Sequence, residues 1–69
     1  MPHVNTENPP YITVKEIKNK FRVIIIAWND IGGDYCVHMI FPTKHKTPEK
    51  ARAEAEYRAK IYSPPLEVR

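Results

Sequence analysis

Residues 21–28 read Phe-Arg-Val-Ile-Ile-Ile-Ala-Trp, and this stretch decides the fold. In a strand, successive side chains point to opposite faces of the sheet. One face would carry Phe21, Val23, Ile25 and Ala27, and the other would carry Arg22, Ile24, Ile26 and Trp28. Both faces are apolar, yet the 69-residue chain contains one clear helical segment. One sheet face therefore needs cover from the chain's own tails, a second copy or a partner.

The flanking segments predict a three-stranded antiparallel meander with residues 21–28 at its centre. Tyr11–Ile17 alternates in the manner of an edge strand, and Lys18–Lys20 is a tight turn in which Asn tolerates the left-handed region. Asn29–Asp34 contains two glycines and is typical of a hairpin loop. Tyr35–Phe41 forms the third strand. Strict alternation would put Tyr35, Val37, Met39 and Phe41 on one side of it and Cys36, His38 and Ile40 on the other.

A helix is expected from Thr47 to Tyr62. Thr47 is a favourable N-cap, Pro48 suits the first helical position, and Ser63 followed by two prolines ends the helix. One stripe consists of Ala51, Ala55, Ala59 and Tyr62, and a second of Ala53, Tyr57 and Ile61. Either the alanine stripe alone or both stripes face the core. Residues 66–69 are a candidate fourth strand. The predicted fold class is therefore α+β, a meander followed by one helix packed on one face.

Length and composition indicate one small domain over residues 11–69, preceded by a flexible arm over residues 1–10 that ends in two prolines. A domain of this size buries only about 60% of its unfolded surface. The net charge of +3 permits contact with nucleic acid or with an acidic protein. A single cysteine, no apolar run long enough to span a membrane and no secretory signal favour the cytoplasm and no membrane partner.

The sequence lacks the residue patterns of an enzyme, so we expect no catalytic residues and no cofactor. The three histidines and Cys36 do not have metal-ligand spacing. We expect Cys36 to be a small core residue and His38 to be half-buried on its strand. The glycine pair in the hairpin loop is not followed by a helix, as a phosphate-binding loop would be.

Binding of another protein is the first functional hypothesis. Trp28 with Ile24 and Ile26, bordered by cations, has the composition of an interface hot spot. The predicted partner-binding residues are Lys15, Arg22, Ile24, Ile26, Trp28, Tyr57 and Ile61. The cations favour a partner with an acidic surface, and a second copy of the chain is the other protein that this face could bind.

The second hypothesis is DNA binding through the sheet. The order of three strands and a helix over residues 11–62 resembles the arm-type DNA-binding domain of tyrosine recombinases and the plant AP2-type domain. The resemblance implies that the sheet enters the major groove. The candidate phosphate contacts are Lys18, Lys20, Lys44 and Lys46. Groove-reading sheets present polar and cationic side chains to the bases, whereas Arg22 is the only cation on the strand 21–28. Protein binding is therefore preferred.

A further resemblance concerns small bacteriophage proteins that inhibit host RNA polymerase. It is carried by the segment Lys20–Val23, the threonine-capped helix from Thr47 to Tyr62, and the short segment Leu66–Val68. Inhibitors of CRISPR complexes are similar in size and style. The resemblance implies a type of function: a compact phage-encoded regulator or inhibitor that occupies the surface of a host protein.

Overall fold

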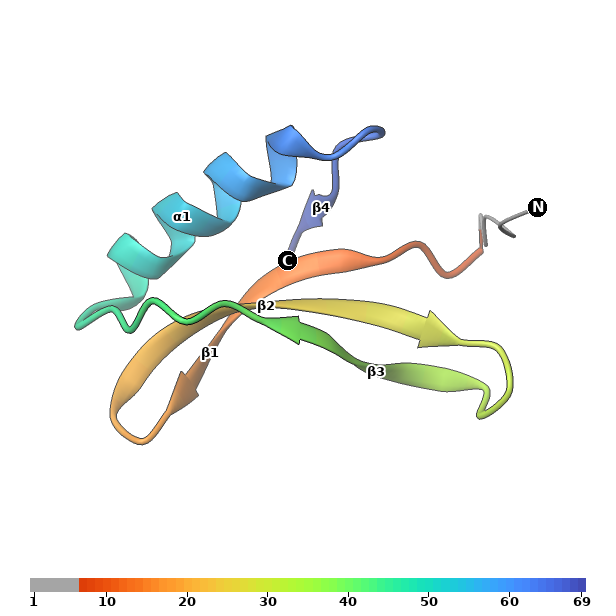
Figure 1. Cartoon of the computed structure of the whole chain (residues 1–69), viewed down its shortest axis with the longest axis horizontal. Coiled ribbons are helices and arrows are strands. Elements are labelled where there is room, and N and C mark those ends of the chain that lie inside the picture. Colours follow the sequence, from red (N-terminus) through yellow and green to blue (C-terminus); the bar gives the residue numbers. More distant parts are fainter. Residues whose placement is uncertain (1–6) are drawn as a thin grey trace.

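The computed structural model describes residues 7–69, and its elements follow the order β1–β2–β3–α1–β4 (Figure 1). The strands are β1 (Tyr11–Ile17), β2 (Lys20–Asn29), β3 (Asp34–Ile40) and β4 (Glu67–Val68), and the helix is α1 (Pro48–Ile61). The strands form one sheet in the order β3-β2-β1-β4. The first three strands are an antiparallel meander, which confirms the predicted α+β class and the central position of β2. Residues 1–6 of the predicted arm lie outside the described residues.

The β1–β2 hairpin closes through a two-residue turn. Lys18 and Asn19 both have positive φ, of 52° and 65°, which is the backbone that a tight hairpin turn needs at both central positions. The turn fixes the register, so that Ile17 pairs with Lys20 and Tyr11 pairs with Ile26.

A β-bulge in β3 corrects the alternation predicted for that strand. Ile25 pairs with Met39 whereas Ile26 pairs with Val37, so His38 is an extra residue without a partner in the ladder. The bulge moves Met39 to the side of α1 and leaves Val37 on the opposite side. Cys36 and His38 are exposed, so the predictions that they are buried or half-buried are wrong. Both lie on an edge strand beyond the reach of the helix.

The helix packs on one side of β1 and β2 through its alanines. Thr47 caps it by accepting a hydrogen bond from the backbone N–H of Lys50 at 3.3 Å, and Pro48 follows as predicted. The buried cluster consists of Ile12, Val23, Ile25, Phe41, Ala51, Ala55 and Ala59. The second helix stripe faces water, and Tyr62, predicted on the alanine stripe, follows the end of α1 and is 38% exposed. Only the three alanines of the first stripe therefore belong to the core. Small side chains let the helix axis approach the sheet closely.

The last strand, β4, confirms the predicted fourth strand. It pairs in parallel with the start of β1, through Tyr11 with Glu67 and Ile12 with Val68. Leu66 and Val68 pack against the buried cluster. The free edge of β1 is thereby partly covered, and β3 is left as the other edge of the sheet.

Candidate binding surface

The side of the sheet opposite α1 carries no second layer in the described part of the chain, and we call it the open sheet face. Paired residues of antiparallel strands share a face, so the register assigns its members. They are Tyr11, Thr13, Lys15, Ile17, Lys20, Arg22, Ile24, Ile26, Trp28, Tyr35, Val37 and Ile40. This set contains five of the seven predicted partner-binding residues.

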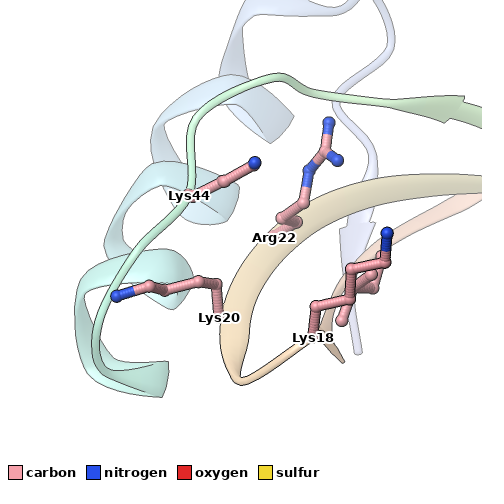
Figure 2. Close-up of a pocket in the computed structure, with 5 residues that line it drawn as sticks. Lys18, Lys20, Arg22 and Lys44 are labelled. Atoms are coloured by element: carbon pink, nitrogen blue, oxygen red, sulfur yellow. The ribbon is translucent and has the colours of Figure 1, made fainter.

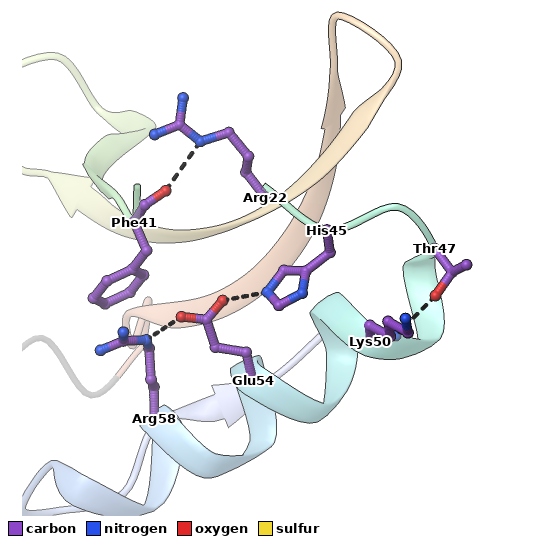
Figure 3. Close-up of polar contacts among 7 residues, drawn as sticks. All are labelled: Arg22, Phe41, His45, Thr47, Lys50, Glu54 and Arg58. Carbon is purple, nitrogen blue, oxygen red and sulfur yellow. Dashed lines mark hydrogen bonds and ion pairs between the residues drawn. The ribbon is translucent and has the colours of Figure 1, made fainter. Parts of the chain in front are cut away.

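The two isoleucines at the centre of the open sheet face are nevertheless buried. Ile24 is 4% exposed and Ile26 is 9% exposed. Neighbouring strands flank them on both sides, and β2 is strongly curved (Figure 1). Figure 3 shows Arg22 on the concave side of this curve, away from α1. Side chains on the inside of a curve converge and cover one another. The prediction that these isoleucines form an exposed hot spot is therefore corrected.

An aromatic cluster occupies the end of the open sheet face nearest the β2–β3 loop. The ring of Tyr35 makes edge-to-face contacts with those of Tyr11 and Trp28, at centroid distances of 5.2 and 5.1 Å. The guanidinium of Arg69 lies 4.3 Å from the centre of the Tyr11 ring. Tyr35 donates a hydrogen bond to the carbonyl of Pro9 at 3.3 Å. Residues from both tails thus contact this end, and Trp28 is half-buried.

The most exposed apolar side chains of the sheet lie on β3. Val37 is 50% exposed and Ile40 is 43% exposed on the open sheet face, and Met39 is 44% exposed on the other side. Sequence reasoning missed all three residues. The available signal was the position of this strand: it is the outer strand of the meander, and one helix centred on β2 and β1 leaves it uncovered.

Cations gather at the other end of the open sheet face. Four of them line one hollow together with Ile17, and they are Lys18, Lys20, Arg22 and Lys44 (Figure 2). They come from the hairpin turn, from β2 and from the loop that precedes α1. Of the predicted phosphate contacts, only Lys46 does not line this hollow. Lys15 is exposed next to it, paired across the hairpin with Arg22. Lys18, Lys20 and Lys44 were named together as candidate phosphate contacts, whereas Arg22 was predicted as a partner-binding residue and not placed with them.

Tyr57 and Ile61 lie apart from the other predicted partner-binding residues. They are 63% and 64% exposed, and helical spacing puts them on the side of α1 that faces away from the sheet. Because α1 covers one sheet face, these two side chains are on the opposite side of the molecule from the open sheet face. One flat partner cannot contact both sets.

A polar network holds the loop that contributes Lys44. Phe21 and His45 exchange two backbone hydrogen bonds of 2.8 Å, which fasten this loop to β2. His45 Nε2 lies 2.6 Å from Glu54 Oε1, and Arg58 Nε donates to the other oxygen of Glu54 at 2.5 Å (Figure 3). Burial raises the pKa of Glu54, but the hydrogen bonds and charges of His45 and Arg58 outweigh it, so that this pKa lies below its usual value of 4.5.

Two further findings bear on the kind of site. Residues 7–69 contain no group of three or more His, Cys, Asp or Glu side chains that could hold a metal ion. Within the same residues, no helix has the length and apolar character needed to cross a membrane.

In comparisons with known proteins, no protein-family model, no curated protein and no solved structure matches the chain. The two resemblances noted from the sequence therefore stay predictions.

Proposed function

We propose that this protein is a small non-enzymatic binding module, a phage-type regulator or inhibitor that acts by occupying the surface of a host protein. The exposure of Val37 and Ile40 on the same sheet face as the cationic hollow is the observation that carries the proposal. An apolar contact beside a charged border is the usual composition of a protein interface. The partner has an apolar centre with acidic residues at one side.

The energy of this contact comes from β3. Hydrophobic free energy scales with the area that leaves water, so Ile24 and Ile26, which are already buried, contribute little. Val37 and Ile40, on the open sheet face, keep roughly half of their surface exposed. Burying the remainder contributes about 1 kcal/mol for each residue before the costs of association. Trp28, at the edge of the aromatic cluster, is mostly covered and adds a smaller exposed area.

The backbone of β3 offers a second kind of contact. This strand ends the sheet order, so its outer edge pairs with no other strand among the described residues. An extended segment of a partner can add to such an edge through main-chain hydrogen bonds. Natural edge strands are commonly protected by lysine, proline or a β-bulge. Lysine and proline are absent from β3, and its bulge at His38 leaves Asp34–Val37 as the regular stretch that a partner strand could pair with. We expect the role to be carried out in the cytoplasm, since the single cysteine requires no oxidising environment.

The proposal is tested by capturing a partner from extracts of the source organism or its host on the immobilised wild-type protein. The retained protein is purified, and its affinity is then measured for the wild type and for the double variant Val37→Asp/Ile40→Asp. Both positions are exposed, so the fold is expected to survive, as circular dichroism would show. The control is Ile31→Asp, a fully exposed apolar residue in the β2–β3 loop. The purified partner should bind the control as it binds the wild type, and should bind the double variant at least about tenfold more weakly.

Three outcomes contradict the proposal. If the partner bound the double variant as tightly as the Ile31→Asp control, β3 would not be part of the contact. If light scattering showed that the wild type self-associates and that the double variant does not, the protein bound at β3 would be a second copy of the chain. The third outcome is tight binding of duplex DNA with an affinity that falls steeply with salt. If Val37→Asp/Ile40→Asp weakened this binding only as much as its added negative charge would, the result would favour the sheet-mediated DNA-binding alternative.

A further inference from the structure

The hollow at the hairpin end of the open sheet face has the features of an anion-binding site. It encloses about 150 Å³. In Figure 2, Arg22 and Lys44 extend into the same space from β2 and from the loop before α1. Lys18 lies across the β2 ribbon from Arg22 in this view, and the Lys20 ammonium points away from Arg22, toward the loop. Arg22 and Lys44 thus bring positive charge to one place from segments more than twenty residues apart in the sequence.

Hydrogen-bonded backbone fixes the positions in the chain from which these cations extend. Lys18 belongs to the tight turn whose φ angles are positive, and Lys20 pairs with Ile17 across the hairpin. The two hydrogen bonds between Phe21 and His45 hold the residue after Lys44 against β2. Arg22 Nε donates to the carbonyl of Phe41 at 3.0 Å, which orients the guanidinium (Figure 3). Its two terminal nitrogens make no hydrogen bond with residues 7–69, and they remain available for an oxyanion.

The positive charge of this hollow is not neutralised by the described part of the chain. Its lining contains no carboxylate, and none of its four cations forms an ion pair with residues 7–69. The carboxylates of Glu54, Glu56 and Glu67 pair with other residues, namely His45, Arg52, Arg58 and Arg69. Like charges around one hollow repel one another, and a bound anion would relieve this repulsion.

We propose that the hollow binds a compact phosphate ligand that carries two or more negative charges, such as the linked phosphates of an oligophosphate chain. A single carboxylate would leave most of the positive charge uncompensated, whereas a phosphate monoester carries about −1.5 to −2. Arginine binds phosphate through two parallel hydrogen bonds, and lysine binds it as a point charge. The lining supplies both kinds of donor.

The arrangement favours a compact ligand over a nucleic-acid backbone. Each strand of a DNA duplex presents one charge about every 3.4 Å along the helix axis, and proteins follow a nucleic-acid backbone with a track of cations. Here the cations line one hollow, and the exposed side chains farther along the open sheet face, Ile40 and Val37, are apolar. Outside the hollow this face offers Lys15, where a track would need a row of cations. This site is distinct from the β3 contact of the proposed function.

The test uses sodium tripolyphosphate as the probe in isothermal titration calorimetry. The variant Lys18→Gln/Lys44→Gln removes two charges from the lining, and Lys46→Gln/Lys60→Gln removes two exposed charges outside it. We expect one tripolyphosphate per chain for the wild type. Affinity should fall by about tenfold or more in the first variant and by less than about threefold in the second. Circular dichroism confirms that both variants are folded.

Equal losses in the two variants would overturn the proposal, because binding would then reflect net charge alone. Absence of saturable binding by the wild type would also overturn it. Duplex DNA that binds more tightly than tripolyphosphate, and that is weakened alike by both double variants, would show a nucleic-acid surface in place of a compact site. The Val37→Asp/Ile40→Asp variant separates the two proposals, since loss of partner binding at β3 leaves one-to-one tripolyphosphate binding in place.

Discussion

At the scale of single residues, Glu54 is the carboxylate on which the local structure depends most. Its side chain is 14% exposed and lies between His45, from the loop, and Arg58, one turn further along α1. The guanidinium of Arg58 also lies 4.1 Å from the centre of the Phe41 ring, so the network reaches the core. One carboxylate thus joins the helix, the loop beside the cationic hollow and the end of the third strand.

We predict that Glu54→Gln lowers the free energy of unfolding by about 1–3 kcal/mol at neutral pH, because it removes the negative charge from two hydrogen bonds. The folded-state pKa of Glu54 is lowered, so its contribution is present above the ordinary value of 4.5 and is lost as pH falls through the lowered pKa. Urea unfolding as a function of pH measures this. The difference between wild type and variant should vanish in acid, where the carboxyl is protonated in both states.

Glu56→Gln is the matched control on the same helix. Glu56 is 58% exposed and lies 3.8 Å from Arg52, so its loss should cost less than about 0.5 kcal/mol and should change little with pH. If Glu54→Gln lowered the free energy of unfolding no more than Glu56→Gln does, the charged network would have no special role in stability. The same conclusion would follow if the loss of stability persisted in acid.

At the scale of secondary structure, the helix is held by close approach more than by large side chains. Ala51 and Ala55 are fully buried and Ala59 is 2% exposed, while Ala53 on the same helix faces water. The sheet supplies the bulk, through Ile12, Val23 and Ile25. Interiors are packed to high density, so there is no room for larger residues on the buried stripe.

We predict that Ala55→Leu destabilises the fold by about 1–3 kcal/mol, because the added atoms must push α1 away from β1 and β2. Ala53→Leu is the matched control, and it should change the unfolding free energy by less than about 0.5 kcal/mol. Thermal unfolding followed by circular dichroism measures both. If the two variants were equally stable, the helix would not lie against the sheet through its alanines.

At the scale of the whole molecule, the net charge of +3 is distributed unevenly. Cations concentrate in the hollow at the hairpin end, whereas aromatic and aliphatic side chains occupy the rest of the open sheet face. Salt screens repulsion among exposed charges over about 10 Å at 0.1 M. The stability of the free protein should therefore respond to ionic strength.

We predict that sodium chloride raises the free energy of unfolding of the wild type by up to about 1 kcal/mol, measured in urea, because it screens repulsion among the hollow's cations. Lys18→Gln/Lys44→Gln should be more stable than the wild type at low salt and should respond less to salt. Lys46→Gln/Lys60→Gln should keep the response of the wild type. A hollow variant less stable than the wild type at low salt would mean that these lysines have favourable partners in the fold.

Local pattern was sufficient to predict the elements. The strand β1 was predicted with its observed bounds, and β2 and β3 with small shifts of their ends. The same holds for the N-cap at Thr47 and for the buried stripe of Ala51, Ala55 and Ala59. These features depend on alternation, turn chemistry and capping, all of which act over a few neighbouring residues.

The exposure of several residues in the candidate surface could not be predicted from local sequence pattern. Alternation assigned Ile24 and Ile26 to the open sheet face correctly, but the curvature of β2 and the flanking strands decide that they are buried. Alternation failed in β3, where the bulge at His38 redistributes the side chains after it. Exposure depends on what lies above a residue, and in a sheet that is decided by segments far away in the chain.

What the sequence determined by itself is therefore the set of elements, their order and the faces of the regular strands β1 and β2, because these follow from the geometry of the backbone and its nearest neighbours. Only the tertiary structure decided which apolar residues stay in water and which cations meet. Lys44 joins Lys18, Lys20 and Arg22 because two backbone hydrogen bonds between Phe21 and His45 bring together segments that the chain separates by more than twenty residues. The sequence could name these lysines as candidate phosphate contacts, but their position around one hollow with Arg22 depends on those long-range hydrogen bonds.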